Sequence, residues 1–134
     1  MRITGEMGNL AAWEKRLFYM CSARPTLHPR ALFSDVTSDY RNPAEPEPGD
    51  EVTIRLRTGR YNVDKAYLVV DNVERVMTRV RSESMFDYYE AKINVGTDKI
   101  YYYFKVELGR TVCYYNQIGA IKELNPYYNF QITP

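Results

Sequence analysis

Cysteine and histidine are scarce in this sequence of 134 residues, which has two cysteines, one histidine and a net charge of only +1. Two cysteines are too few for a disulfide scaffold. The single histidine, His28, has no cysteine or carboxylate cluster nearby, so we expect a structural residue and neither a metal nor another cofactor. The near balance of charge lacks the basic excess that is typical of nucleic-acid-binding proteins, so we expect no nucleic-acid partner.

The two cysteines have different surroundings. Cys113 lies between Val112 and Tyr114 in an apolar run, which predicts a buried thiol. A disulfide between Cys21 and Cys113 stays open as an alternative, because pairing cannot be read from a sequence.

Long apolar runs are also missing, and none of the runs present could span a membrane. Near the N-terminus, Trp13-Glu14-Lys15-Arg16 interrupts the stretch that a signal peptide would need as its apolar core. We therefore expect no membrane partner, and we favour the cytoplasm as the compartment.

The first 30 residues read differently from the rest of the chain. Leu10, Trp13, Leu17 and Cys21 are spaced as on one face of a helix, and Asn9 is a suitable N-cap. The pattern predicts a short amphipathic helix or an extended arm within residues 1–30.

From residue 31 onward the pattern is that of β-strands. In 51–58, Val52, Ile54 and Leu56 alternate with polar residues, which is typical of a half-buried strand. The proline-rich segment 41–50 predicts an exposed loop. By the same reasoning we expect about seven or eight strands, over 31–36, 51–58, 65–71, 74–81, within 85–95, and over 99–108, 111–116 and 125–134.

Regularly spaced short strands without helical segments between them predict one all-β domain over 31–134, an immunoglobulin-like antiparallel β-sandwich. A five-stranded oligonucleotide-binding barrel is the alternative, but such barrels need a basic groove that this chain lacks. The inward side chains are expected to be Val52, Ile54 and Leu56, then Ala66, Leu68 and Val70, then Val76, Thr78 and Val80, and finally Ile100, Tyr102, Phe104, Val106 and Leu108.

Five segments carry a resemblance to a known family. They are Val52–Thr58, Val63–Leu68, Met85–Ala91, Ile100–Val106 and Tyr114-Tyr115-Asn116 ahead of Gly119. In order and spacing, residues 30–134 resemble the N-terminal immunoglobulin-like domain of neopullulanases, cyclomaltodextrinases and maltogenic amylases, also called carbohydrate-binding module family 34. The resemblance implies a place before an α-amylase-type (β/α)8 barrel of glycoside hydrolase family 13, and hence a longer parent enzyme acting on α-glucans or cyclodextrins. It also implies packing against that barrel and a homodimer.

We expect no catalytic residue in this chain. A (β/α)8 barrel needs about 250 residues, and glycoside hydrolysis needs two carboxyl groups held at a set separation in a cleft. The carboxylates of Glu74, Glu90 and Glu107 lie on strand faces among basic residues, where cross-strand pairing explains them.

Tyrosine is abundant, with 13 residues, and offers a binding hypothesis. Tyr101 and Tyr103 should face outward, and so should one of the pair Tyr88 and Tyr89. Together they could form an aromatic platform that stacks on the pyranose rings of an α-glucan. The alternative is that these tyrosines fill strands or contact a neighbouring domain.

A second hypothesis is assembly through aromatic side chains. Trp13, Tyr61, Tyr127 and Tyr128 lie on the arm, a turn and the last segment, where contacts with a partner subunit would be made. For Trp13 the alternative is packing against its own sandwich.

The interpretation of the whole sequence is a non-catalytic domain that serves packing, dimerisation and weak glucan binding. Its alternatives are a free-standing interaction module without a carbohydrate role and an autonomous starch-binding module.

Overall fold

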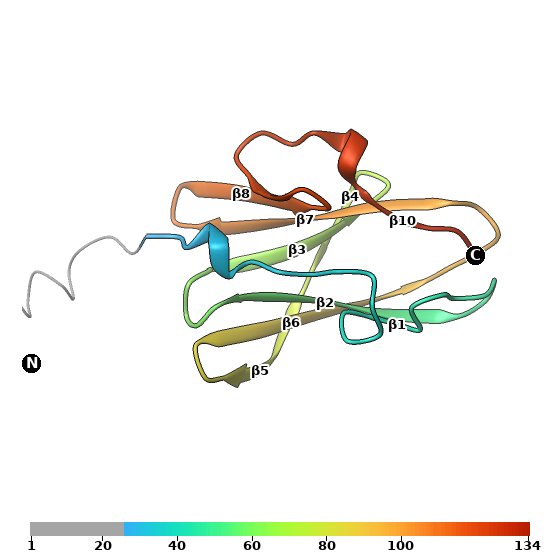
Figure 1. The fold of residues 1–134 in the computed structure, drawn as a ribbon, viewed down its shortest axis with the longest axis horizontal. Coiled ribbons are helices and arrows are strands. Elements are labelled where there is room, and N and C mark those ends of the chain that lie inside the picture. Colours follow the sequence, from blue (N-terminus) through green and yellow to red (C-terminus); the bar gives the residue numbers. More distant parts are fainter. Residues whose placement is uncertain (1–25) are drawn as a thin grey trace, which may run out of the picture.

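The computed structural model describes residues 26–134, which form two antiparallel β-sheets packed face to face (Figure 1). The four-stranded sheet has the order β1-β2-β6-β5, and the six-stranded sheet has the order β4-β3-β7-β8-β9, with β10 paired to β7. The strands are β1 Arg41–Asn42, β2 Glu51–Gly59, β3 Lys65–Val70, β4 Val73–Val76, β5 Thr78–Glu83, β6 Phe86–Asn94, β7 Ile100–Leu108, β8 Thr111–Asn116, β9 Gly119–Ile121 and β10 Phe130–Ile132. This confirms the predicted all-β sandwich.

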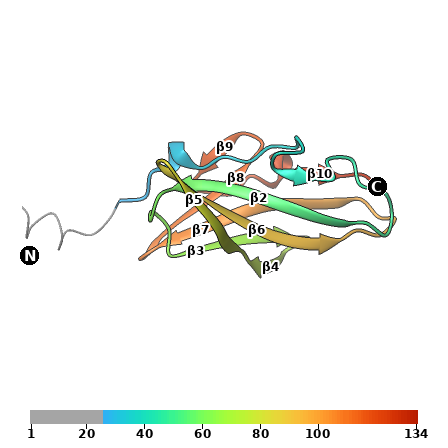
Figure 2. The same ribbon diagram turned by 90° about the horizontal axis from the view of Figure 1, so that it is seen from below.

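The described chain begins at one end of the sandwich and reaches its C-terminus at the other (Figure 1). Seen from below, the four-stranded sheet lies in front of the six-stranded sheet (Figure 2). The strand β7 is central to the second sheet: β3 lies on one side of it, and β10 and β8 follow one another on the other side.

The core lies between the sheets and is built by alternation along the strands. All five residues of β7 predicted to face inward are buried, and those of β2 and β3 are buried as well. Tyr102, Phe104, Tyr115 and Phe130 form an aromatic cluster there, with Tyr102 and Phe130 stacked at 5.2 Å between ring centres. Period-two burial, on which the fold prediction depended, is therefore confirmed for these strands.

Residues 74–81 were predicted as one strand, and this is wrong. The chain crosses from the six-stranded to the four-stranded sheet at Met77, whose N–H donates to the carbonyl of Ala66. Met77 is 4% exposed, whereas Val76 and Val80 are 69% and 52% exposed, the reverse of the predicted phase. The crossing turns Met77 into the core, and an irregular register between Arg79 and Arg81 leaves Val80 outside the ladder.

The two ends of the predicted strand series also differ from the structure. Residues 29–31 form a 3-10 turn that starts at Pro29, and the segment 31–36 makes only one bridge, between Phe33 and Arg57. The predicted loop 41–50 begins with the short strand β1, in which Arg41 is buried. At the other end, the 3-10 turn Pro126–Tyr128 precedes β10, so only part of 125–134 is a strand.

Arg41 connects these two ends. Its Nη1 donates to the Tyr102 hydroxyl at 3.3 Å and to the carbonyl of Gln131 at 3.0 Å, and its Nε donates to the carbonyl of Ala44. A buried guanidinium is tolerated only when its N–H groups have acceptors. Arg41 thereby anchors the last strand to the first.

Cys113 is buried as predicted, and burial raises the pKa of its thiol. Cys21, Trp13 and the predicted helix or arm before Thr26 lie outside the described residues.

Candidate functional site

Two predicted site residues, Tyr101 and Tyr103, lie side by side on the outer face of the six-stranded sheet. They alternate with the buried Tyr102, and Tyr101 is 46% exposed. The ring of Tyr103 packs edge-on against Tyr114 at 6.0 Å, and burial raises the pKa of its hydroxyl. The outward orientation predicted for both tyrosines is therefore what the structure shows.

A groove of about 330 Å³ lies over these two rings. It is lined by Asp71, Asn72, Tyr101, Tyr103, Pro126 and Asn129, and we call it the tyrosine groove. Sequence reasoning found the two tyrosines but missed the other four residues, because they come from a hairpin turn and from the last loop of the chain.

The turn between β3 and β4 forms one wall of the tyrosine groove. Asp71 and Asn72 have φ angles of 48° and 69°, a left-handed conformation that Asp and Asn adopt more readily than most residues. The Asp71 N–H donates to the carbonyl of Tyr101 at 3.0 Å, and the Tyr101 N–H donates to Asp71 Oδ1 at 3.3 Å. These bonds hold the carboxylate of Asp71 against the backbone of Tyr101.

The 3-10 turn Pro126–Tyr128 forms the other wall. Asn125 caps it, because its Oδ1 accepts a hydrogen bond from the Tyr127 N–H at 3.2 Å. Asn129 follows the turn, and its Oδ1 is buried and accepts no hydrogen bond from the residues that the structure describes. A buried acceptor without a donor is unfavourable, and this one belongs to a residue that lines the tyrosine groove.

The structure does not bring Tyr88 or Tyr89 to this groove. Both lie on β6, which belongs to the four-stranded sheet, so the predicted platform that joined one of them to Tyr101 and Tyr103 does not form. Tyr89 points into the core and is 8% exposed. Tyr88 faces outward on the opposite side of the sandwich, with the Arg81 guanidinium 4.3 Å from its ring centre.

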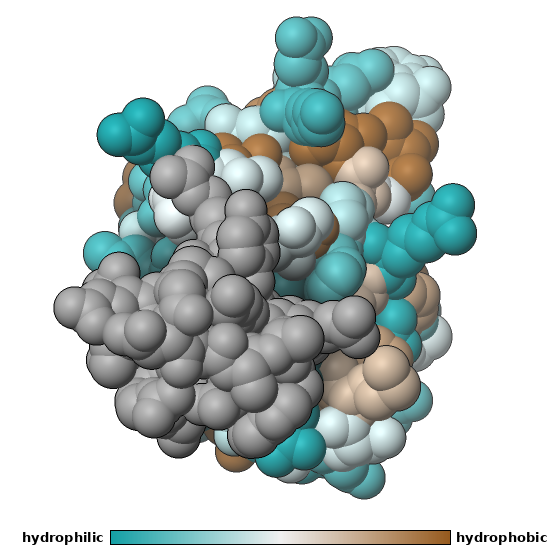
Figure 3. All heavy atoms as spheres, turned by 90° about the vertical axis from the view of Figure 1, so that its left-hand side faces the viewer, coloured by the Kyte–Doolittle hydropathy of each residue, from teal (hydrophilic) through white to brown (hydrophobic). Residues whose placement is uncertain are grey.

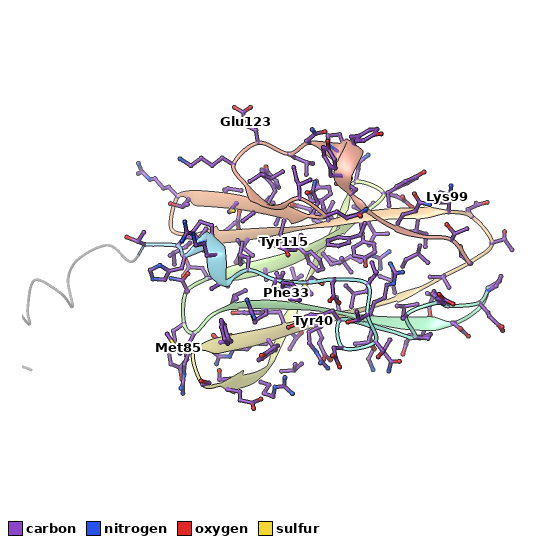
Figure 4. The ribbon with its side chains drawn as sticks, viewed as in Figure 1. Phe33, Tyr40, Met85, Lys99, Tyr115 and Glu123 are labelled. Atoms are coloured by element: carbon purple, nitrogen blue, oxygen red, sulfur yellow. The ribbon has the colours of Figure 1, made fainter. Side chains whose placement is uncertain are left out.

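The outer face of the four-stranded sheet has a different character. The guanidinium of Arg57 lies 5.2 Å from the ring centre of Phe33 and 4.1 Å from that of Phe86. Phe33 (labelled with Tyr40 in Figure 4) in turn packs edge-on against Tyr40, with 5.0 Å between ring centres. Burial raises the pKa of Tyr40. We call this surface, made of Phe33, Tyr40, Arg57, Arg81, Phe86 and Tyr88, the arginine–aromatic face.

Met85 lies on the turn between β5 and β6, at the end of the sandwich where the described chain begins, and is 75% exposed (Figure 4). Tyr61 lies on the turn between β2 and β3, which contacts that turn through a hydrogen bond from the Arg60 N–H to the carbonyl of Met85, and is 67% exposed. Tyr61 has a φ of 51°, and its N–H donates to the buried carboxylate of Asp87 at 2.9 Å. Arg60 and Arg79 flank its ring at 5.2 and 5.5 Å. The turn therefore presents Tyr61 in one fixed backbone conformation.

The remaining exposed aromatics and carboxylates are accounted for locally. Tyr127 and Tyr128 are exposed on the last 3-10 turn and pack edge-on against each other. Glu74 and Glu107 pair with Lys105, at 2.8 and 3.8 Å, and the hydrogen bond that Lys105 donates to Glu74 raises the pKa of Lys105.

On the opposite sheet, Arg55 binds Glu90 through Nε and Nη2, at 2.8 and 2.7 Å. This pair and the pair of Glu74 on β4 with Lys105 on β7 are cross-strand, as predicted. Glu107 instead pairs with Lys105 of its own strand, and its cross-strand partner is the Tyr67 hydroxyl, which donates a hydrogen bond to it at 3.2 Å.

Residues 26–134 contain no group of three or more His, Cys, Asp and Glu side chains arranged to hold a metal ion. Within the same residues, no helix has the length and apolar character needed to cross a membrane.

The sequence model described as "Alpha amylase, N-terminal ig-like domain" matches residues 40–133. The chain belongs to this family of α-amylase N-terminal immunoglobulin-like domains. The match covers most of the segment on which the resemblance was based, and it confirms that resemblance. No curated protein sequence matches the chain.

Solved structures agree with the fold of this amylase N-terminal domain. A cyclomaltodextrinase superposes with a TM-score of 0.64 at 18% identity, over 78% of this chain and 19% of its own. A maltogenic amylase from S. marinus gives 0.59 at 14% identity, over 84% and 16% of the two chains. The type III pullulan hydrolase from Thermococcus kodakarensis gives 0.50 at 18% identity, over 75% and 16%. The chain thus spans less than a fifth of each of these proteins.

Proposed function

We propose that this chain is the non-catalytic N-terminal domain of an α-amylase-family glycoside hydrolase that acts on α-glucans or cyclodextrins in the cytoplasm. The family match over residues 40–133 carries this proposal. It is supported by the coverage of the three solved structures, in each of which this fold accounts for less than a fifth of a chain named as a cyclomaltodextrinase, amylase or pullulan hydrolase.

The parent enzyme is tested by sequencing the gene beyond codon 134. We expect a (β/α)8 barrel downstream, and its absence would favour a free-standing interaction module. The chain alone should release no reducing sugar from maltoheptaose or pullulan, whereas the full-length enzyme should do so.

The domain also serves packing and dimerisation in this proposal. Exposed Tyr61 and Met85 at one end, and the arginine–aromatic face along one side, offer the residue types that anchor interfaces. Sedimentation velocity on the full-length enzyme should show a dimer that Tyr61→Ala or Met85→Ala weakens. An enzyme that sediments as a monomer would contradict the dimer while leaving the barrel proposal intact.

The glucan-binding part of the proposal rests on the tyrosine groove. It is lined by Tyr101 and Tyr103 together with three polar residues, Asp71, Asn72 and Asn129, which carry a carboxylate and two side-chain amides. Aromatic surface with a few fixed polar groups is the composition that recognises a pyranose ring, whose faces are apolar and whose rim carries hydroxyls.

Titration of the chain with maltoheptaose and with β-cyclodextrin, followed by amide chemical shifts, tests this part. Shifts should appear at Asp71, Asn72 and Asn129, and Tyr101→Ala combined with Tyr103→Ala should abolish them. Tyr61→Ala is the control, because it removes a more exposed ring that does not line the tyrosine groove. If millimolar sugar causes no shift in the unsubstituted chain, the groove has no role in glucan binding.

A further inference from the structure

The end of the sandwich where the described chain begins carries an apolar groove of about 600 Å³, which Tyr101 and Tyr103 do not line. Leu27, Pro29, Val112 and Cys113 give it an apolar lining, and Thr26, Thr111 and Lys122 are the polar residues beside them. We call it the β8 groove. Figure 3 looks onto this end and shows hydrophobic residues, in brown, next to hydrophilic residues in teal.

The β8 groove is open because β9 is shorter than β8. The strand β9 pairs only with Tyr114–Asn116, so the first half of β8, Thr111–Cys113, has no neighbouring strand on that edge among residues 26–134. An open strand edge with apolar side chains is a surface that proteins normally cover.

The chain itself provides a segment that fits. Thr26, the first described residue, lines the β8 groove, and 25 residues precede it. Within them, Leu10, Trp13 and Leu17 share the spacing of an apolar helical stripe. Cys21, which continues this spacing, lies only five residues before Thr26. An extended chain spans about 3.5 Å per residue, so the C-terminal end of the stripe is within reach of the groove.

We propose that residues 9–21 dock in the β8 groove, with Leu10, Trp13 and Leu17 against Leu27, Val112 and the open edge of β8. In this arrangement residues 9–21 bury the open edge of β8, and Trp13 packs within its own chain.

A second apolar groove at the same end, of about 660 Å³, is less suitable for this segment. It is lined by Met85, Phe86 and Ala31 but bordered by Arg30 and Arg60. Residues 9–21 carry Lys15 and Arg16 against a single acidic residue, so two further arginines oppose docking there. The β8 groove contributes only one cation, Lys122.

Trp13 is the only tryptophan, so its fluorescence reports on the segment alone. The experiment compares the 134-residue chain with three variants that each place an arginine on the surface: Val112→Arg in the β8 groove, Met85→Arg in the second groove and Val73→Arg on β4 as the matched strand control. Emission wavelength and acrylamide quenching are measured, and far-UV circular dichroism checks that each variant is folded.

If residues 9–21 dock in the β8 groove, Trp13 is shielded in the unsubstituted chain, in Val73→Arg and in Met85→Arg. In these three proteins its emission should be blue-shifted, and acrylamide should quench it severalfold less than it quenches free indole. In Val112→Arg, emission should shift to the red and quenching should rise severalfold. Fully solvent-exposed emission in the unsubstituted chain would overturn the proposal. So would protection that Val112→Arg leaves unchanged, or that Met85→Arg removes instead. If Val112→Arg does not fold, the reporter is moved to the groove itself, as Lys122→Trp in a Trp13→Phe background. Docking then predicts that Leu17→Asp shifts the emission of this new tryptophan to the red. Emission that Leu17→Asp leaves unchanged would overturn the proposal.

Discussion

The two outer faces of the sandwich use aromatic side chains in different ways. On the four-stranded sheet, the Arg57 guanidinium contacts the rings of Phe33 and Phe86, and Arg81 contacts Tyr88. On the six-stranded sheet, Tyr103 contacts another tyrosine and Tyr101 stays 46% exposed beneath a groove. Aromatic abundance alone therefore does not identify a binding surface, since a ring already in contact with a cation has less surface to offer a ligand.

Both faces depend on the same core, and the largest expected effect lies there. Phe104→Ala removes a fully buried ring from β7 and should lower the free energy of unfolding by about 3–5 kcal/mol. Tyr103→Ala, the adjacent residue on the outer face, should cost much less. Urea denaturation of both variants measures the difference, and equal losses would mean that Tyr103 is part of the folding core.

The comparison predicts a structural role for Arg57 and none for Tyr101. Arg57→Ala loses two ring contacts and the hydrogen bond from its Nε to the carbonyl of Ala31, which should cost about 1–3 kcal/mol. Tyr101→Ala should change stability by less than about 0.5 kcal/mol. Thermal unfolding decides this, with Arg57→Lys as the control that retains charge and loses the planar stacking. If Tyr101→Ala is the more destabilising substitution, the two faces have been assigned the wrong way round.

A pH effect is expected from the tyrosines of the core. Burial raises the pKa of Tyr102, Tyr89 and Tyr115 above the ordinary value. These hydroxyls ionise more easily in the unfolded chain, so their contribution to stability is complete below pH 10 and is lost as the pH rises above it. Unfolding free energies measured between pH 8 and pH 11 should fall, and Tyr102→Phe should make the fall shallower. Phe130→Leu, which changes the core without removing a hydroxyl, should lower the whole curve and keep its slope.

The smallest expected effect concerns Tyr88, which was predicted to join Tyr101 and Tyr103 but lies on the other sheet. Tyr88→Ala should leave any maltoheptaose-induced shifts at Asn72 and Asn129 unchanged, because Tyr88 lies on the opposite face. Loss of those shifts in Tyr88→Ala, in a variant shown to be folded, would contradict the separation of the two faces.

Much of the fold was predictable because burial in a strand alternates locally. The inward phase of β7, from Ile100 to Leu108, follows from period two alone, and so does the outward position of Tyr101 and Tyr103. The same rule was wrong for 74–81, since Met77 lies at a crossing between sheets, where alternation along one strand no longer applies.

The site was less predictable than the fold. Asp71 and Asn72 are recognisable as turn residues, but nothing local indicates that their turn lies beside Tyr101. Asn129 comes to the same groove through β10, which follows it and pairs with β7 at Tyr101 and Tyr102. No local signal predicts this pairing.

By itself, the sequence determined which side chains the strands β2, β3 and β7 would bury, the all-β class and the family, since these depend on the order of neighbouring residues. The tertiary structure alone decided which sheet each strand joins. That choice depends on hydrogen bonds between segments far apart in the chain, and it placed Tyr88 away from Tyr101 while bringing Asn129 next to it.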